Sequence, residues 1–217
     1  MSGEFVAKME GVLDLYELPY DERRPMVCID ESPKQLLADT REPLPPAPGR
    51  PARQDHEYTR NGMQEVFVCC EPKVGLRRLE VKAQRTTKDF AHFMKRVADE
   101  FYPEAGCIVV VLDNLNTHKT GAFYETFEPE EARRLTKRFE FHYTPKHGSW
   151  LNMAEIELAA LSKVCLERRI ADASKLKKEI AIYERKRNQI RATIDWRFTT
   201  PDARKKMRRI YPLNSSG

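Results

Sequence analysis

The sequence predicts an α/β protein, with a mixed five-stranded sheet flanked by helices and a basic helical extension at its C-terminal end. Two short strand-like stretches, 65–70 and 77–83, lie close together in the chain, which is typical of an antiparallel hairpin. Strand-like and helix-like stretches then alternate, which is typical of parallel strands joined by helices. The run CIVVVLD at 107–113 is the most apolar of all. Such a run belongs in the centre of a sheet that is covered on both faces.

The expected strands are short and differ in pattern. The first (PMVCIDES) is apolar and ends in carboxylates, and the second (EVFVCC) follows an Asn61-Gly62 turn signal. The third (RRLEVKA) alternates in polarity and is expected to pair with the second in an antiparallel manner. In chain order, the expected strands are 25–32, 65–70, 77–83, 107–113 and 139–143.

Helices are expected where apolar residues recur at intervals of three and four. The clearest case is 150–168, in which Leu151, Ala154 and Leu158 begin such a series. Thr86 or Thr87 is the expected N-cap of another helix. In chain order, the expected helices are 4–15, 87–102, 121–127, 129–138, 150–168, 172–191 and 201–210.

The chain shows no internal repeat and no second apolar core, so residues 25–170 are expected to form one domain. Residues 1–24 are expected to be a helix and linker, and residues 171–217 a basic helical extension packed on the same domain. The proline-rich stretch Arg41–Arg53 has no periodicity and is expected to be an extended loop. Two alternatives remain open for this loop: it clamps DNA or a partner subunit, or it has no role.

Composition excludes several classes of protein. The 217 residues are 41% hydrophobic and 33% charged, which fits one globular domain. No apolar run approaches the roughly 18 residues needed to cross a bilayer, and the N-terminus mixes charged and apolar residues unlike a signal peptide. The five cysteines lie in apolar stretches and form no CxxC pair, so we expect reduced, buried thiols and no zinc site.

Charge points to the class of partner. The formal net charge is +5, and the basic excess is concentrated after Leu161. A basic region attached to a more neutral body favours a polyanionic partner, most simply nucleic acid. The alternative is a set of solvated helix faces without a partner.

Three carboxylates stand out by their positions. Asp30 is expected at the end of the first strand, and Asp113 at the end of the central strand. If these strands are neighbours, the two side chains lie side by side, and Glu155 can lean over them from the following helix. Three crowded carboxylates repel one another unless a cation lies between them. Two Mg²⁺ or Mn²⁺ ions would fit such a site, and the pattern therefore predicts a metal-dependent nuclease or strand-transfer enzyme.

Three motifs resemble the catalytic blocks of mariner-like insertion-sequence transposases, which carry a DDE triad on a ribonuclease H-like fold. They are VCIDES at 27–32, VVLDNLNTH at 110–118 and YTPKHGSWLNMAEIEL at 143–158. The stretch DWRFTTPDARKKMRRIYP at 195–212 also resembles the C-terminal end of one bacterial branch of this family. The resemblance covers nearly the whole chain, and its motifs are specific in combination.

The resemblance assigns the catalytic and metal-binding roles to Asp30, Asp113 and Glu155. Glu155 lies 42 positions after Asp113, which is longer than is usual in the wider family, and an insertion is expected around 128–134. Glu157 points about 200° away from Glu155 on a helix and is not expected to share the metal. Glu31 is expected to support the site from behind or to face solvent. The implied cofactors are two Mg²⁺ ions, for which Mn²⁺ can substitute.

The resemblance also implies a set of auxiliary, DNA-binding residues. Lys146 and His147 are expected near the scissile phosphate, and Trp150 is expected either to stack on a base or to pack in the core. His118 is expected either to orient a metal-bound water or to cap a loop. The complete auxiliary set is Asn114, His118, Lys146, His147, Trp150 and Asn152.

The implied function is DNA cleavage at the ends of an insertion sequence, followed by joining of the freed 3′-hydroxyl to target DNA at a TA dinucleotide. The implied partners are element ends, target DNA and a second copy of the chain, in the bacterial cytoplasm at the nucleoid. Relatives carry N-terminal helix-turn-helix domains, so this chain resembles a catalytic half whose DNA-recognition portion is missing or separate. Two alternatives remain: a ribonuclease H-like nuclease without joining activity, and a catalytically inert DNA-binding remnant.

Overall fold

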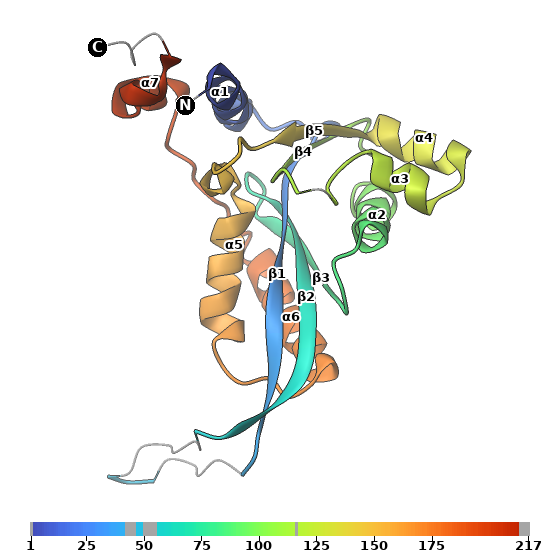
Figure 1. Ribbon diagram of the computed structural model, residues 1–217, viewed down its shortest axis with the longest axis vertical. Helices are drawn as coiled ribbons and strands as arrows, with labels where there is room; N and C mark the ends of the chain where they lie inside the picture. Colours follow the sequence, from blue (N-terminus) through green and yellow to red (C-terminus); the bar gives the residue numbers. More distant parts are fainter. Residues whose placement is uncertain (1, 42–46, 50–55, 116, 213–217) are drawn as a thin grey trace.

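The computed structural model describes residues 2–41, 47–49, 56–115 and 117–212, and within them five strands form one mixed sheet in the order β3-β2-β1-β4-β5 (Figure 1). The first three strands pair in antiparallel manner, whereas β4 is parallel to both β1 and β5. The predicted hairpin and the predicted parallel half of the sheet are therefore both confirmed. The strands are β1 (Met26–Asp39), β2 (Tyr58–Glu71), β3 (Leu76–Lys82), β4 (Ile108–Leu112) and β5 (Phe139–Tyr143).

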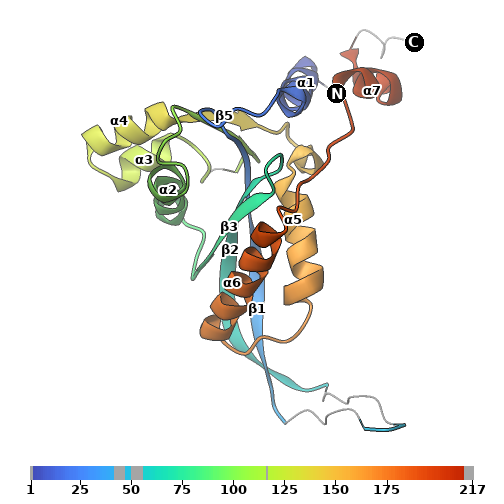
Figure 2. The same cartoon turned by 180° about the vertical axis from the view of Figure 1, so that it is seen from behind.

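Helices cover both faces of this sheet (Figures 1 and 2). One face packs against α1 (Gly3–Glu17), α5 (Ala154–Leu161) and α6 (Ala173–Gln189), and the other against α2 (Thr87–Arg96), α3 (Gly121–Thr126) and α4 (Pro129–Arg138). The helix α7 (Thr200–Lys206) lies against α1. In the part of the chain that the structure describes, no helix has both the length and the apolar character that crossing a bilayer requires.

The core is divided between the two faces by the alternation of the strands. Every residue of β4 is buried, as predicted for the central apolar run. Val109 and Val111 point to the side of α1 and α5, whereas Ile108, Val110 and Leu112 point to the side of α2 and α3. A strand that is apolar on both sides is required here because helices cover both faces.

The hairpin β1–β2 differs from the prediction. β1 does not end at residue 32 but continues to Asp39, and the paired strand begins at Tyr58 rather than at residue 65. The prediction of a turn at Asn61-Gly62 is wrong. Both residues lie inside β2, opposite the point where the register shifts between Gln35 and Leu37 of β1. Gly62 adopts a φ of +91°, which a β-bulge accommodates as readily as a turn does. The hairpin therefore extends beyond the rest of the sheet (Figure 1).

Two of the predicted helices are not α-helical along their whole length. The stretch 150–168 begins with a short 3₁₀ turn, Ser149–Leu151, and the α-helix starts only at Ala154 because Asn152 adopts an extended conformation. Its last turn, Ser162–Leu166, is π-helical, as is the end of α2 at Val97–Phe101. The Thr86 N-cap of α2 is confirmed. The predicted loop Arg41–Arg53 lies largely outside the described residues.

The free edge of β3 is covered by side chains of α6. Asn188 accepts a hydrogen bond from the backbone N–H of Arg77 (2.9 Å) and donates one to its carbonyl (2.9 Å). Glu184 accepts a bond from the N–H of Leu79 (2.8 Å). These bonds satisfy backbone groups that an edge strand would otherwise expose to pairing with other chains. Helix α6 is thus attached to the sheet by hydrogen bonds as well as by apolar packing.

A buried ion pair joins β3, α5 and α6. The carboxylate of Glu157, fully buried, lies 3.0 Å from Arg77 and 3.1 Å from Arg187, and it accepts a hydrogen bond from the hydroxyl of Tyr183 (2.7 Å). The guanidinium of Arg77 also donates to the carbonyls of Gly75 and Ala192. As predicted, Glu157 does not share a site with Glu155. Its role is structural.

Replacing Glu157 by Gln should lower the free energy of unfolding by about 3–5 kcal/mol, because Arg77 would stay buried without its counter-charge. Urea denaturation followed by circular dichroism measures this change. The matched control is Glu155→Gln, an exposed carboxylate on the same helix, which should cost less than about 0.5 kcal/mol. An unchanged urea midpoint for Glu157→Gln would contradict the structural role.

Candidate active site

The parallel pairing of β1 and β4 brings Asp30 and Asp113 together. Met26 pairs with Val109 and Cys28 with Val111, and the same register continued beyond β4 places Asp113 beside Asp30. The two strands are neighbours, which is the condition under which the sequence placed Asp30 and Asp113 side by side. The prediction that Asp30 ends its strand is wrong, because β1 continues to Asp39. It is the neighbouring strand, β4, that ends here and leaves the two carboxylates at the open edge.

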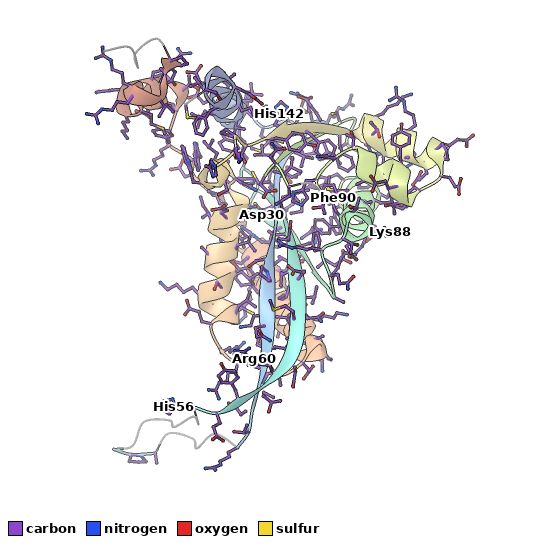
Figure 3. The ribbon with its side chains drawn as sticks, viewed as in Figure 1. Asp30, His56, Arg60, Lys88, Phe90 and His142 are labelled. Carbon is purple, nitrogen blue, oxygen red and sulfur yellow. The ribbon has the colours of Figure 1, made fainter. Side chains whose placement is uncertain are left out.

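Glu155 is positioned by the residue that starts its helix. The side-chain amide of Asn152 donates a hydrogen bond to the carbonyl of Ile29 (2.8 Å), and its oxygen accepts one from the N–H of Ala154 (3.1 Å). Asn152 therefore connects the first turn of α5 to β1 at the residue before Asp30. Glu155, exposed in this first turn, lies close enough for its charge to act on Asp30. Figure 3 shows Asp30 near the middle of the molecule, between α5 and α2.

The electrostatics of Asp30 show that the carboxylates crowd together. Burial raises the pKa of Asp30 to about 7, against the effect of a hydrogen bond from the N–H of Glu31. The negative charges of Asp113, Glu31 and Glu155 raise this pKa further. Such a group is stabilised either by a proton or by a cation. The site is therefore built to hold positive charge.

Asp113 is held by a buried histidine. His118 Nδ1 lies 2.7 Å from Asp113 Oδ1, and His118 Nε2 lies 3.0 Å from Glu31 Oε2. Burial alone would lower the pKa of His118, but its hydrogen bonds to Asp113 and Glu31 outweigh burial and raise the pKa to about 9. The ring also packs on Phe90, with centroids 4.7 Å apart. At neutral pH His118 is thus a cation between two carboxylates.

The donor set fits a magnesium-type ion. Within the described residues, no group of three or more histidine, cysteine, aspartate or glutamate side chains is arranged to hold a metal ion. Mg²⁺ does not require such a group, because it keeps several waters and takes only one or two carboxylates from the protein. The raised pKa of Asp30 is the observation that favours a cation here, since Asp30, Asp113 and Glu155 offer only oxygen ligands.

The exposed auxiliary residues line a groove beside this site. Asn114, Lys146 and His147 form a depression of about 420 Å³ together with Lys8 and the N-terminal end of α1. His147 adopts a φ of +66°, a strained conformation for a residue other than glycine, and such strain is common at functional sites. The lining also includes Glu4, which pairs with Lys8 at 2.9 Å, so Lys146 and His147 are the basic groups that suit a phosphodiester backbone.

The other auxiliary residues contact other parts of the protein. His118 and Asn152 are buried and brace Asp113 and α5. Trp150 is 39% exposed and stacks on Trp196, with centroids 6.5 Å apart and ring planes at 17°. It also contacts Phe198 edge-on, so it attaches the C-terminal segment to the loop before Glu155.

Of the two roles expected for Glu31, support of the site from behind is the one that fits the structure. Its side chain is 1% exposed and lies against His118, so the expectation that it might face solvent is wrong, and its support of the site runs through this contact. The available signal was the pair Asp30-Glu31 on one strand, since consecutive side chains point to opposite faces. One of these two side chains therefore had to point into the protein, here between β1 and α2, unless that face of the strand was exposed.

Comparisons with known proteins agree with this geometry. Residues 25–177 match the family model described as DDE superfamily endonuclease. No curated protein matches the sequence. Among solved structures, the chain is similar to the Mos1 mariner paired end complex with Mn, with a TM-score of 0.57 and 16% identity over 88% of this chain and 58% of that one.

Two further structures share this fold. The Mos1 transposase paired-end complex with left transposon end has a TM-score of 0.55 and 16% identity over 100% of this chain and 63% of that one. The Mos1 strand transfer complex has a TM-score of 0.55 and 15% identity over 85% and 55%, respectively. The chain therefore spans less than two thirds of the length of these transposases. At such identities the likeness establishes the fold, and the predicted ribonuclease H-like architecture is confirmed.

The family model covers most of the chain, including both strands that carry the aspartates, the helix that carries Glu155 and the first turns of α6. Fold and sequence family thus agree, and the chain belongs to the DDE superfamily endonuclease family.

Proposed function

We propose that this chain is the catalytic domain of a DDE transposase, which cleaves DNA at the ends of a mobile element and joins the freed 3′-hydroxyl to target DNA. The observation that carries the proposal is the position of Asp30 beside Asp113 at the end of β4, with Glu155 near enough for its charge to act on Asp30. Burial, and then these charges, raise the pKa of Asp30. The family membership and the similarity to mariner transposase structures support it.

Asp30, Asp113 and Glu155 would hold two Mg²⁺ ions, for which Mn²⁺ can substitute. Bound there, the ions would activate the attacking water or 3′-hydroxyl and stabilise the leaving oxygen of the phosphodiester. The other residues of the chain bind and orient. Lys146 and His147 would hold the DNA backbone in the groove next to Asp113. His118 and Asn152 keep Asp113 and Glu155 in place.

The partners follow from the reaction. The substrates would be element ends and target DNA, with TA as the target dinucleotide, and two copies of the chain would act on two ends. The solved complexes of the Mos1 transposase contain paired transposon ends, which supports this arrangement. Recognition of the terminal sequence would need a helix-turn-helix portion, in the same or a separate chain. The bacterial cytoplasm, at the nucleoid, is the proposed location.

Asp30→Asn, Asp113→Asn and Glu155→Gln should each reduce nicking of supercoiled plasmid in Mn²⁺ by about 10³-fold or more, since each removes a ligand from ions that supply several kcal/mol of transition-state stabilisation. DNA binding, measured by fluorescence anisotropy, should stay within about twofold. The control is Glu130→Gln, an exposed carboxylate on α4. Full activity in any of the three variants would remove that residue from the site.

A second assay separates a transposase from a nuclease that only cuts. The chain is given a pre-cut duplex with a free 3′-hydroxyl, together with a target plasmid and Mn²⁺. A transposase should yield joined products that disappear with EDTA and with Asp113→Asn. Nicking of the plasmid without joining would assign the nuclease function instead, and DNA binding without either product would assign an inert remnant.

The charge of Asp30 should make the metal-free protein less stable as pH rises. The folded state keeps the proton of Asp30 up to a pKa of about 7, whereas the unfolded chain loses it near 3.8, so stability falls with pH between these values. Asp30→Asn should therefore raise the free energy of unfolding above pH 7 by up to about 4 kcal/mol, and by progressively less toward pH 4. Thermal unfolding in EDTA at several pH values measures the difference.

Mg²⁺ should reduce this difference in stability between Asp30→Asn and the wild type. At pH 8 the ion should raise the melting temperature of the wild type more than that of Asp30→Asn, because binding to the folded state alone is stabilising. A stability gain from Asp30→Asn that is the same at pH 5 and pH 8 would contradict the raised pKa.

A further inference from the structure

Glu31 is a buried carboxylate to which the proposed reaction gives no direct role. Its side chain is 1% exposed, and neither oxygen has a hydrogen bond of good geometry within the described residues. Its nearest charged neighbours are His118 Nε2 at 3.0 Å and the largely exposed Arg85 at 3.8 Å. A buried carboxylate is costly unless it is paired with a cation. Glu31 therefore depends on His118.

His118 is confined on every side. Its ring is 1% exposed and packs on Phe90, and its backbone carbonyl accepts a hydrogen bond from the hydroxyl of Tyr143 (2.7 Å). Each ring nitrogen faces a carboxylate oxygen, at 2.7 Å on the Asp113 side and 3.0 Å on the Glu31 side. Nδ1 is hydrogen-bonded to Asp113, and Nε2 forms an ion pair with Glu31 without good hydrogen-bond geometry, so rotation of the ring would lose both contacts.

The position of Asp113 depends on this bridge. Asp113 follows β4 and lies in a loop, where the sheet no longer fixes it. The hydrogen bonds that described residues donate to it, from His118 (2.7 Å) and from the N–H of Leu115 (3.4 Å), both go to Oδ1. The short bond is the one from His118. It holds Oδ1 and leaves Oδ2 without a hydrogen bond from the described residues.

We infer that Glu31 and His118 form a positioning pair that orients Asp113 for metal binding, connecting the two aspartates through the opposite face of β1. Asp30 and Glu31 are consecutive on β1, so Asp30 lies in the metal site and Glu31 lies behind it. A histidine that is held by a second carboxylate is a known means of orienting a metal ligand, and loss of such partners weakens metal affinity by about 10–100-fold. The inference rests on the metal site proposed above.

The test measures Mn²⁺ binding directly, through loss of the electron paramagnetic resonance signal of free Mn²⁺ on titration with protein. His118→Asn removes the bridge and should weaken Mn²⁺ binding by about 10–100-fold. Glu31→Gln keeps the size of the side chain but removes its charge, and should weaken binding by about tenfold. The double variant should be no weaker than His118→Asn alone, because both residues act through one bond to Asp113.

The matched control is Glu157→Gln, which also removes a buried carboxylate from a charged partner but lies on the other side of α5 from the site. It should lower thermal stability and leave Mn²⁺ affinity unchanged. Circular dichroism at the titration temperature verifies that each variant is folded. A merely structural role of Glu31 and His118 would give the pattern of Glu157→Gln.

A plasmid-nicking assay adds a second readout. The Mn²⁺ concentration for half-maximal nicking should rise in His118→Asn and Glu31→Gln, while the rate at saturating Mn²⁺ should recover to within a few-fold of wild type. Asp113→Asn should not recover at any Mn²⁺ concentration. Wild-type Mn²⁺ affinity in both His118→Asn and Glu31→Gln, with binding lost in Asp113→Asn, would overturn the positioning pair and leave the metal site standing. Absence of Mn²⁺ binding in the wild type would overturn both.

Discussion

The buried pair of Arg77 and Glu157 is the interaction on which the rest of the structure depends. It joins the edge strand β3 to α5 and, through Tyr183 and Arg187, to α6. Glu157 lies on the buried face of α5, and Glu155 faces solvent, because positions two apart on a helix point in nearly opposite directions. The buried carboxylate therefore attaches α5 to β3 and α6, and Glu155 lies on the opposite side of this helix.

A second constraint comes from the parallel register of β1 and β4. It places Asp30 and Asp113 beside each other at the point where β4 ends and β1 continues. Burial and the neighbouring charges raise the pKa of Asp30, so ionisation of this carboxyl costs folding free energy. A cation can recover this free energy by binding there. The protein thus carries an instability at the position where the proposed reaction needs an ion.

Sequence patterns predicted most of this fold, because they report burial. The run at 107–113 and the strand at 139–143 correspond closely to β4 and β5, and α4 has the predicted bounds. The Asn61-Gly62 pair misled, since a bulge and a turn both use glycine at positive φ. The start of α5 was also missed, because Leu151 continues the apolar spacing of the helix although Asn152 interrupts it to bond Ile29. Such tertiary bonds leave no periodic signal.

The alternation of a single strand explains why the carboxylates of the site fall into two groups. On β1, Asp30 points to the side of α5 and meets Glu155, whereas Glu31 points to the side of α2 and meets His118. Asp113 belongs to both groups, since it lies beside Asp30 and is bonded to His118. Asp113 is therefore the carboxylate whose orientation the fold controls from both faces of the sheet. A resemblance that names three residues locates the chemistry, but the geometry that holds them includes Glu31, His118 and Asn152.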